Sequence, residues 1–239
     1  MTMQGQRVVV FGGTSGIGYA VAQRSLAAGA SVAVASRRKA SVEAAVGRLG
    51  EGATGRDVDV ADAAAVASFL QDTGPFDHLV YTAGEPLSMM EIDKLDLGRA
   101  RAFFEARFFS ALGAVHAARP LLREGGSITL TSGSAADRPG AGWALGASVC
   151  GAVNSLTRAL AVELAPLRVN AVAPGILRSP IWSEMDIEQQ EAMYEQVGKS
   201  LPVGRIGEVG DAADAYLYCM TQPYTTGTVL PVDGGTLLV

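Results

Sequence analysis

The sequence is poor in the residues from which metal sites and disulfide frameworks are built. Its 239 residues include two cysteines, Cys150 and Cys219, and two histidines. Two isolated cysteines do not form a disulfide framework, so a reducing cytoplasm is the expected location. A structural zinc site needs clustered Cys or His ligands, and we therefore expect no metal site.

The sequence also lacks the features that are typical of nucleic-acid-binding, membrane and secreted proteins. Its net charge of -5 leaves no excess of basic residues to bind nucleic acid. No continuous apolar run reaches the ~18 residues of a membrane span. The N-terminal residues 1–7 are polar and do not resemble a signal peptide. We expect a small-molecule partner, with neither nucleic acid nor a membrane.

Apolar residues, 49% of the chain, recur in a regular alternation of strands and helices. The run Val8–Phe11 is continuously apolar and ends at glycines, which is typical of a parallel strand buried on both faces. The same pattern predicts further strands at 31–35, 54–58, 77–82, 127–132, 168–172 and 228–232, and helices at 17–28, 40–49, 62–72, 95–123, 142–164, 186–198 and 208–221. Such alternation predicts one α/β domain over residues 1–239, a doubly wound parallel sheet of about seven strands with helices on both faces.

A glycine-rich turn joins the first predicted strand to the first predicted helix. Gly12 permits a tight turn, Gly16 lets backbone approach a pyrophosphate, and Gly18 lets the helix pack on the strand. The helix N-terminus offers free N–H groups and a partial positive charge to phosphates. A glycine-rich turn alone is weak evidence, but its place between strand and helix favours a nucleotide site. The residues that we expect at this phosphate site are Gly12, Thr14, Ser15, Gly16, Ile17 and Gly18.

The end of the second predicted strand distinguishes between the two nicotinamide cofactors. NAD sites usually place an acidic residue there, whereas this chain has Ser36, Arg37 and Arg38. Guanidinium groups bind phosphate in a bidentate way and keep their charge. The sequence therefore predicts NADP, with its 2′-phosphate held at this loop; the alternative is a solvated basic loop.

Several segments together resemble the short-chain dehydrogenase/reductase family, which implies a Rossmann-like fold. The turn Gly12-x-x-x-Gly16-x-Gly18 has the family's spacing, and 168–175 reads Arg-Val-Asn-Ala-Val-Ala-Pro-Gly as in the family. The resemblance spans nearly the whole chain. It implies additional cofactor contacts by Asp57, Val58, Ala83, Gly84, Pro174, Gly175, Ile176 and Ser179.

The residues that the family uses for catalysis are replaced. Members of the family protonate the substrate oxygen with a Tyr assisted by a Lys, and a Ser and an Asn complete the site. By alignment to this family, the Tyr falls on Gly146, the Lys on Cys150, the Ser on Gly133 and the Asn on Arg107. No tyrosine occurs between Tyr81 and Tyr194, so a shift of register does not restore the proton donor.

Three residues are our candidates for a replacement catalytic role. Ser132 and Ser134 flank the family's Ser position and could hydrogen-bond a carbonyl, and Arg107 could stabilise an oxyanion. Arg107 could equally be a surface charge, and Cys150 is interpreted as a small buried helix residue. Tyr81 could point into the core, and Tyr194 is expected to be an exposed residue of the family's substrate lid.

Two functions from different classes remain open. The first is an NADP(H)-dependent oxidoreductase that acts on an unknown carbonyl or alcohol with an atypical catalytic centre; apolar residues of the lid region 181–197 favour an apolar substrate. The second is a catalytically inactive NADP(H)-binding protein, a sensor or scaffold. The resemblance also implies a homodimer or homotetramer, built on the helices at 95–123 and 142–164. For that interface we expect Phe104, Phe108, Ala111 and Val115 from the first helix, and Ala147, Cys150, Gly151, Asn154 and Arg158 from the second.

Overall fold

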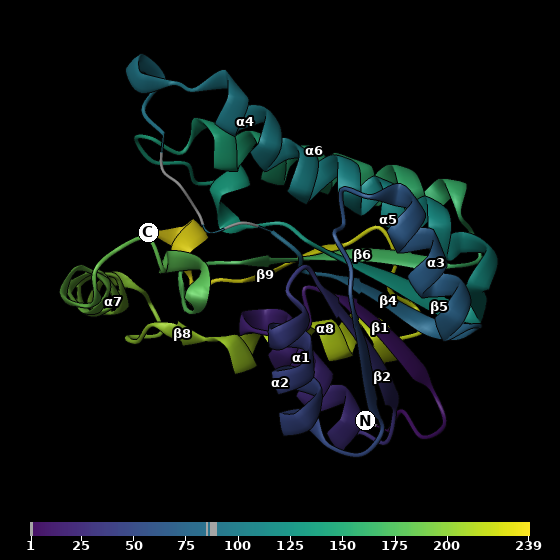
Figure 1. The fold of residues 1–239 in the computed structure, drawn as a ribbon. Coiled ribbons are helices and arrows are strands. Elements are labelled where there is room, and N and C mark those ends of the chain that lie inside the picture. The colour runs from purple at the N-terminus through teal and green to yellow at the C-terminus, as the bar shows by residue number, and fades with distance from the viewer. Residues whose placement is uncertain (1, 85, 87–89) are drawn as a thin grey trace.

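The protein contains one central parallel sheet with helices on both of its faces (Figure 1). The computed structural model describes residues 2–84, 86 and 90–239. Within those residues the main sheet has seven strands in the order β3-β2-β1-β4-β5-β6-β9, and each neighbouring pair is parallel. The predicted fold class is confirmed.

The elements begin and end within a few residues of their predicted positions, apart from one long helix. The strands of the main sheet are β1 Arg7–Phe11, β2 Ser31–Ser36, β3 Ala53–Asp57, β4 Phe76–Tyr81, β5 Leu122–Thr131, β6 Arg168–Pro174 and β9 Val229–Val232. The helices are α1 Gly16–Ala27, α2 Lys39–Leu49, α3 Ala63–Thr73, α4 Leu97–Phe104, α5 Ser110–Ala118, α6 Ala144–Glu163, α7 Ile187–Ser200 and α8 Val209–Thr221. A separate two-stranded sheet, which the sequence did not predict, pairs β7 Leu177–Arg178 with β8 Gly207–Glu208.

Alternate side chains of the central strands fill two separate cores. Val8 and Val10 face the side covered by α1 and α8, whereas Val9 and Phe11 face the side covered by α3, α5 and α6. Figure 1 shows these two helical layers above and below the sheet. Because both faces are covered, the central strands need apolar side chains in both directions, which explains their continuous apolar runs.

The segment predicted as one helix over 95–123 is broken into pieces. Helix α4 ends at Phe104, a π-helical turn spans Glu105–Phe109, and α5 ends at Ala118. A 3₁₀ turn at Arg119–Leu121 then leads directly into β5, which begins at Leu122. The prediction of a continuous helix was wrong because Pro120 ends the helix before residue 123 and a π turn interrupts it.

Helix α6 is long and apolar enough to cross a membrane when only its length and composition are considered. A core helix of a soluble protein passes the same test. In this structure Val153 and Leu160 of α6 lie in the core on one face of the sheet. The helix is therefore a packed layer of the domain.

The strand order changes direction between β1 and β4. Chain connections from β1 run outward to β2 and β3 on one side, and later strands fill the other side. In open parallel sheets, ligands bind at the carboxyl ends of the strands beside such a switch point. The loops after β1 and β4 are therefore the first place to look for a site.

A buried histidine in the central sheet is expected to make the free energy of unfolding depend on pH. His78 in β4 is 2% exposed, and its ring nitrogens lie 2.9 Å from the Ser127 hydroxyl and 3.2 Å from Gln6 Oε1. Burial lowers the pKa of His78 to about 4, aided by Arg168 and opposed by Asp77. The neutral ring is therefore the folded form.

We predict that the protein loses stability as the pH falls from 6.5 to 5. The unfolded chain binds a proton at the ordinary histidine pKa and the folded chain does not, so this contribution is complete above pH 6.5 and declines below it. The expected loss over this range is ~2 kcal/mol. Urea unfolding of the protein and of His78→Gln at both pH values measures it. An equal pH dependence in the two proteins would contradict the prediction.

Candidate functional site

The turn after β1 lies directly against the loop after β4. Gly12 has a φ of 85°, and a Cβ placed on it would lie 2.7 Å from the Ala83 nitrogen. Gly18 is packed equally tightly, because a Cβ there would collide with the Gly12 carbonyl oxygen and the Thr82 hydroxyl. Only glycine fits at these two positions, and the three segments form one compact wall.

The first turn of α1 is open to a ligand. Ser15 occupies the N-cap position, but its side chain makes no capping hydrogen bond, and the first turn contains no acidic residue. Gly16 has a φ of 53°, and the nearest atom to a Cβ there would be Pro180 Cδ at 3.6 Å. The first N–H groups of a helix have no partner within the helix, so these groups are suited to a phosphate.

The basic residues predicted to bind a 2′-phosphate lie at the same edge of the sheet. Arg37 and Arg38 follow β2 and are exposed, and Arg38 is the N-cap residue of α2. Ser36 is paired with Asp57 across the β2–β3 ladder, and the nitrogen of buried Val58 donates to Ser36 O at 3.0 Å. These residues surround the position next to the glycine-rich turn where an adenosine ribose would lie.

The segment after β6 lies close to the glycine-rich turn. The Gly175 nitrogen donates to Val232 O at 3.0 Å, and a Cβ on Gly175 would lie 2.8 Å from Asp233 Cα. Ser179 follows in extended backbone and makes no side-chain cap bond. Since a Cβ on Gly16 would lie 3.6 Å from Pro180 Cδ, the segment that contains the predicted contact residues Pro174–Ser179 lies beside the glycine-rich turn, and we expect the cofactor groove between them.

Two of the replaced catalytic positions lie in contact. A Cβ on Gly133, just after β5, would lie 3.1 Å from Cys150 Sγ on α6. The Ser132 hydroxyl is buried and donates to Asn154 Oδ1 at 2.5 Å, with the Cys150 carbonyl at 3.2 Å. It is thus directed into α6. Ser134 begins a 3₁₀ turn at 134–136 and is half-buried.

The Cys150 thiol is protonated at neutral pH. Burial raises its pKa, while Arg107 and a hydrogen bond with Ser132 lower it and Asp137 raises it further. Together these effects raise the pKa of Cys150 above its ordinary value. Cys150 therefore provides neither the cation of a lysine nor a thiolate.

Arg107 provides a positive charge at this position. It lies in the π turn Glu105–Phe109, and a Cβ on Gly84 would lie 2.8 Å from its guanidinium carbon. The guanidinium also stacks at 4.6 Å on the ring of Phe103. Arg107 thus extends from the helical layer to the loop after β4 and acts electrostatically on Cys150.

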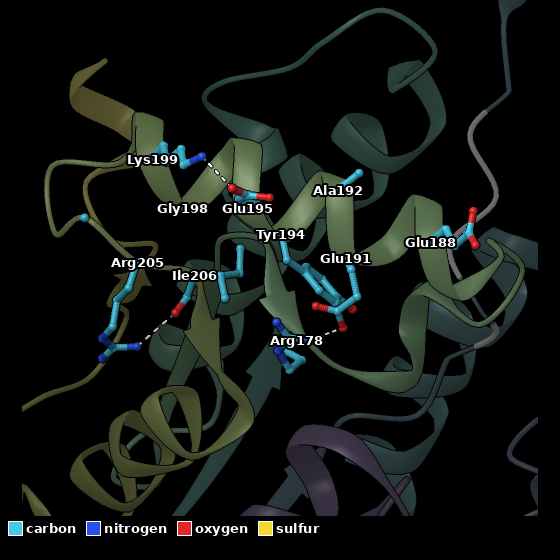
Figure 2. A pocket seen from close by; sticks show the side chains of 11 residues that line it. Arg178, Glu188, Glu191, Ala192, Tyr194, Glu195, Gly198, Lys199, Arg205 and Ile206 are labelled. Atoms are coloured by element: carbon cyan, nitrogen blue, oxygen red, sulfur yellow. Dashed lines mark hydrogen bonds and ion pairs between the residues drawn. The ribbon is translucent and has the colours of Figure 1, made fainter.

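Neither tyrosine considered as a substitute donor faces this groove. Tyr81 is 2% exposed and donates to the Ala106 carbonyl at 2.6 Å. Tyr194 was expected to be exposed, and this expectation is wrong because its ring is 3% exposed and lies 4.4 Å beneath the Arg178 guanidinium. Figure 2 shows Tyr194 pointing from α7 toward Arg178. Arg178 also forms an ion pair with Glu191. All three residues line a pocket of about 650 Å³.

The lid and the start of α6 meet through the chain's two tryptophans, a contact that the sequence did not reveal. Trp182 is buried and its indole nitrogen donates to Leu177 O at 3.0 Å. Its ring centroid lies 6.3 Å from that of Trp143. Among the residues that the structure describes, a Cβ on Gly146 would meet only Trp143 Cε3, at 4.0 Å. The space beside Gly146 is therefore bordered by aromatic surface.

The described residues contain no group of three or more His, Cys, Asp or Glu side chains placed to hold a metal ion. The groove instead combines a helix N-terminus, basic residues at the end of β2 and glycines that admit close backbone approach. These features define a dinucleotide-binding α/β domain.

Comparison with known proteins narrows this class to a family. Residues 12–236 match the family described as Enoyl-(Acyl carrier protein) reductase. The chain is 36% identical to short-chain dehydrogenase/reductase ucsE of Acremonium sp., over 97% of this chain and 95% of that protein. The chain belongs to the short-chain dehydrogenase/reductase family.

Solved structures agree with this assignment. A small-chain dehydrogenase crystallised in complex with NADPH is 36% identical, with a TM-score of 0.88 over 99% of this chain and 100% of that one. The MalC reductase/Diels-Alderase from Malbranchea aurantiaca is 30% identical, with a TM-score of 0.92 over 99% of this chain and 98% of that one. The cofactor expected from the sequence is the one held by the first of these relatives.

We predict that Arg37→Asp weakens NADPH binding by ~2 kcal/mol, because it removes a charge-assisted pair and adds repulsion. Calorimetric titration of NADPH and NADH measures the effect, and NADH binding should change much less. Arg119→Asp is the control, since this exposed residue precedes β5 at the opposite edge of the sheet. Equal affinity of the unmodified protein for NADPH and NADH would refute the assignment of Arg37.

Proposed function

We propose that residues 1–239 form one NADP(H)-dependent oxidoreductase domain with an atypical catalytic centre, acting on a carbonyl or alcohol. The glycine-rich turn and the N-terminus of α1 would hold the pyrophosphate, and Ser36, Arg37 and Arg38 the 2′-phosphate. Asp57, Val58, Ala83, Gly84 and the segment 174–179 would contact the rest of the cofactor. The bound cofactor supplies or accepts the hydride.

The position of Arg107 is the observation that supports this proposal most. Reduction of a carbonyl places negative charge on its oxygen, and a fixed guanidinium beside Gly84 can stabilise that charge. Arginine keeps its proton at all ordinary pH values, so it cannot act as the acid. Water entering beside Gly146 would supply the proton.

The two serines have different roles in this scheme. Ser134 is proposed to donate a hydrogen bond to the substrate oxygen, the role that the family resemblance gives to a serine at the position of Gly133. The Ser132 hydroxyl is bonded to Asn154 and would act on a carbonyl only after that bond breaks. We therefore place Arg107 and Ser134 next to the reacting oxygen, with Ser132 supporting α6.

The substrate is proposed to be apolar. Trp143 lies beside Gly146, and Trp182 of the lid region packs near Trp143. A flat or hydrophobic molecule would bury surface against both rings, which is a favourable exchange with water.

A second candidate is a catalytically inactive protein that binds NADP(H). The replacement of the family's Tyr and Lys by Gly146 and the protonated thiol of Cys150 favours it. Cofactor titration combined with a turnover assay on a panel of apolar ketones and aldehydes separates the two. Tight binding with no turnover across the panel would favour the inactive protein.

We predict that Arg107→Met lowers kcat by ~10²-fold, because loss of a group that stabilises an oxyanion has about this effect. Cys150→Ala should change kcat little, and overall turnover on generic ketones should be weak because no general acid is present. Arg138→Met is the matched control, an exposed arginine on the neighbouring loop. Steady-state kinetics with NADPH measures all three variants, and an Arg107→Met enzyme with unchanged kcat would refute the assignment.

We also propose a homodimer or a homotetramer, in the reducing cytoplasm. The expected interface needs correction, because Ala111, Val115 and Asn154 are buried inside the subunit. Exposed apolar residues instead mark the outer side of the same two helical segments. These residues are Leu97, Phe109, Leu112 and Val162, and an apolar groove of about 470 Å³ lies between α4 and Leu145 of α6.

We predict that the double variant Phe109→Glu/Leu112→Glu is a folded monomer, because it places charge on this apolar surface where the two-fold partner would pack. Light scattering at micromolar concentration should give the mass of an oligomer for the unmodified protein and of a monomer for the variant. Ile187→Glu, at an exposed apolar residue of α7, is the control and should remain oligomeric. A monomer mass for the unmodified protein would exclude this assembly.

A further inference from the structure

The π turn in the helical layer disrupts the usual hydrogen bonding of the helix at one carbonyl. In an α-helix, the Ser110 N–H would donate to the carbonyl of Ala106, four residues before it. Here the Ser110 N–H donates to Glu105 O instead. The Ala106 carbonyl therefore needs another donor, because an unpaired buried carbonyl is costly.

Tyr81 supplies that donor from the sheet. Its hydroxyl donates to Ala106 O at 2.6 Å, and the two residues lie 25 positions apart in the sequence. The ring is 2% exposed and packs beside Phe11, with centroids 6.0 Å apart. Burial raises the pKa of Tyr81, so the phenol keeps its proton and remains a donor.

The residue that follows Ala106 is Arg107. Its guanidinium lies against Gly84, three residues beyond Tyr81, and over the Phe103 ring at 4.6 Å. Tyr81 and Gly84 thus contact the π turn from the end of β4 at two points, one through the phenol and one through the backbone. A turn that relaxed to regular α-helix would rotate Arg107 relative to both.

We propose that Tyr81 is a positioning residue: its bond to the Ala106 carbonyl stabilises the π turn in the form that directs Arg107 into the groove. The importance of this for turnover rests on the proposed function, whereas the placement of Arg107 does not. Tyr81 thus acts from the core and never contacts the substrate.

The chain contains its own reporter of the Arg107 position. The charged and titratable groups that act on the Cys150 thiol are Arg107, which lowers its pKa, and Asp137, which raises it; Ser132 adds a hydrogen bond. Movement of the guanidinium away from the groove should therefore raise the pKa of Cys150. Since this readout needs neither substrate nor turnover, it tests positioning independently of catalysis.

The experiment measures the alkylation rate of Cys150 by iodoacetamide from pH 7 to pH 10 in a Cys219→Ala background, where Cys150 is the single thiol. Tyr81→Phe removes the hydroxyl and keeps the ring. We expect the midpoint of its pH profile to rise, so that the rate at pH 8.5 falls ~3- to 10-fold, as a thiolate mechanism requires. Arg107→Met should give a shift at least as large.

Two further variants make the result specific. Gly84→Ala puts a Cβ 2.8 Å from the guanidinium carbon, so it should displace Arg107 and shift the midpoint without altering Tyr81. Tyr218→Phe removes a tyrosine hydroxyl on the other side of the sheet, 3.4 Å from the Thr225 hydroxyl, and should leave the midpoint unchanged. A Tyr81→Phe midpoint equal to that of the parent, or a Tyr218→Phe shift of the same size, would overturn the proposal.

Turnover then separates this proposal from the proposed function. If both proposals hold, Tyr81→Phe lowers kcat by about the same factor as it lowers the alkylation rate of Cys150 at pH 8.5. The KM for NADPH should stay unchanged. A shifted thiol midpoint in a protein with no turnover would support the positioning role and reject the oxidoreductase. A normal thiol midpoint with reduced kcat would reject the positioning role alone.

Discussion

The contact between the loops after β1 and β4 is the constraint on which the rest of the site depends. At Gly12 the two backbones approach so closely that no side chain fits between them. This contact aligns the N-terminus of α1 with the residues that follow β4, and those residues in turn touch the π turn through Gly84. The proposed phosphate-binding end and the proposed reacting end are therefore linked by a continuous series of contacts, between backbones at Gly12 and with the Arg107 side chain at Gly84. A methyl group at Gly12 or Gly18 would disturb both ends together.

Much of the fold could be predicted from the sequence because burial on both faces leaves a continuous apolar signal. Val8–Phe11 is the clearest example, and the glycine-rich turn follows it as expected. The π turn could not be predicted, since one extra residue within a helix barely changes the spacing of its apolar side chains. Tyr194 was misplaced because its ring packs under Arg178, which lies in the short strand β7 that the sequence did not predict. Ala111 and Val115 were assigned to the wrong surface because apolar periodicity identifies a buried face without identifying its neighbour.

The charge at the proposed reacting end of the groove comes from an unusual place. The family resemblance implies a lysine on α6, where this chain has the protonated thiol of Cys150. Arg107 brings a cation to the same region from the neighbouring π turn, on the same side of the sheet. An arginine is longer than a lysine and cannot release its proton. Arg107 can therefore supply the positive charge that the family's lysine supplies, but it cannot take part in proton transfer. A site of this kind is better suited to stabilising charge than to transferring protons.

The contact between Trp143 and Trp182 also allows the lid to be followed by intrinsic tryptophan fluorescence. These two residues are the whole tryptophan content of the chain, and their ring centroids lie 6.3 Å apart. The intrinsic emission of the protein therefore originates almost entirely at the contact between the lid and α6. Indole emission overlaps the absorption of reduced nicotinamides, so energy transfer from this pair would report both the arrival of the cofactor and the opening of the lid without any attached dye.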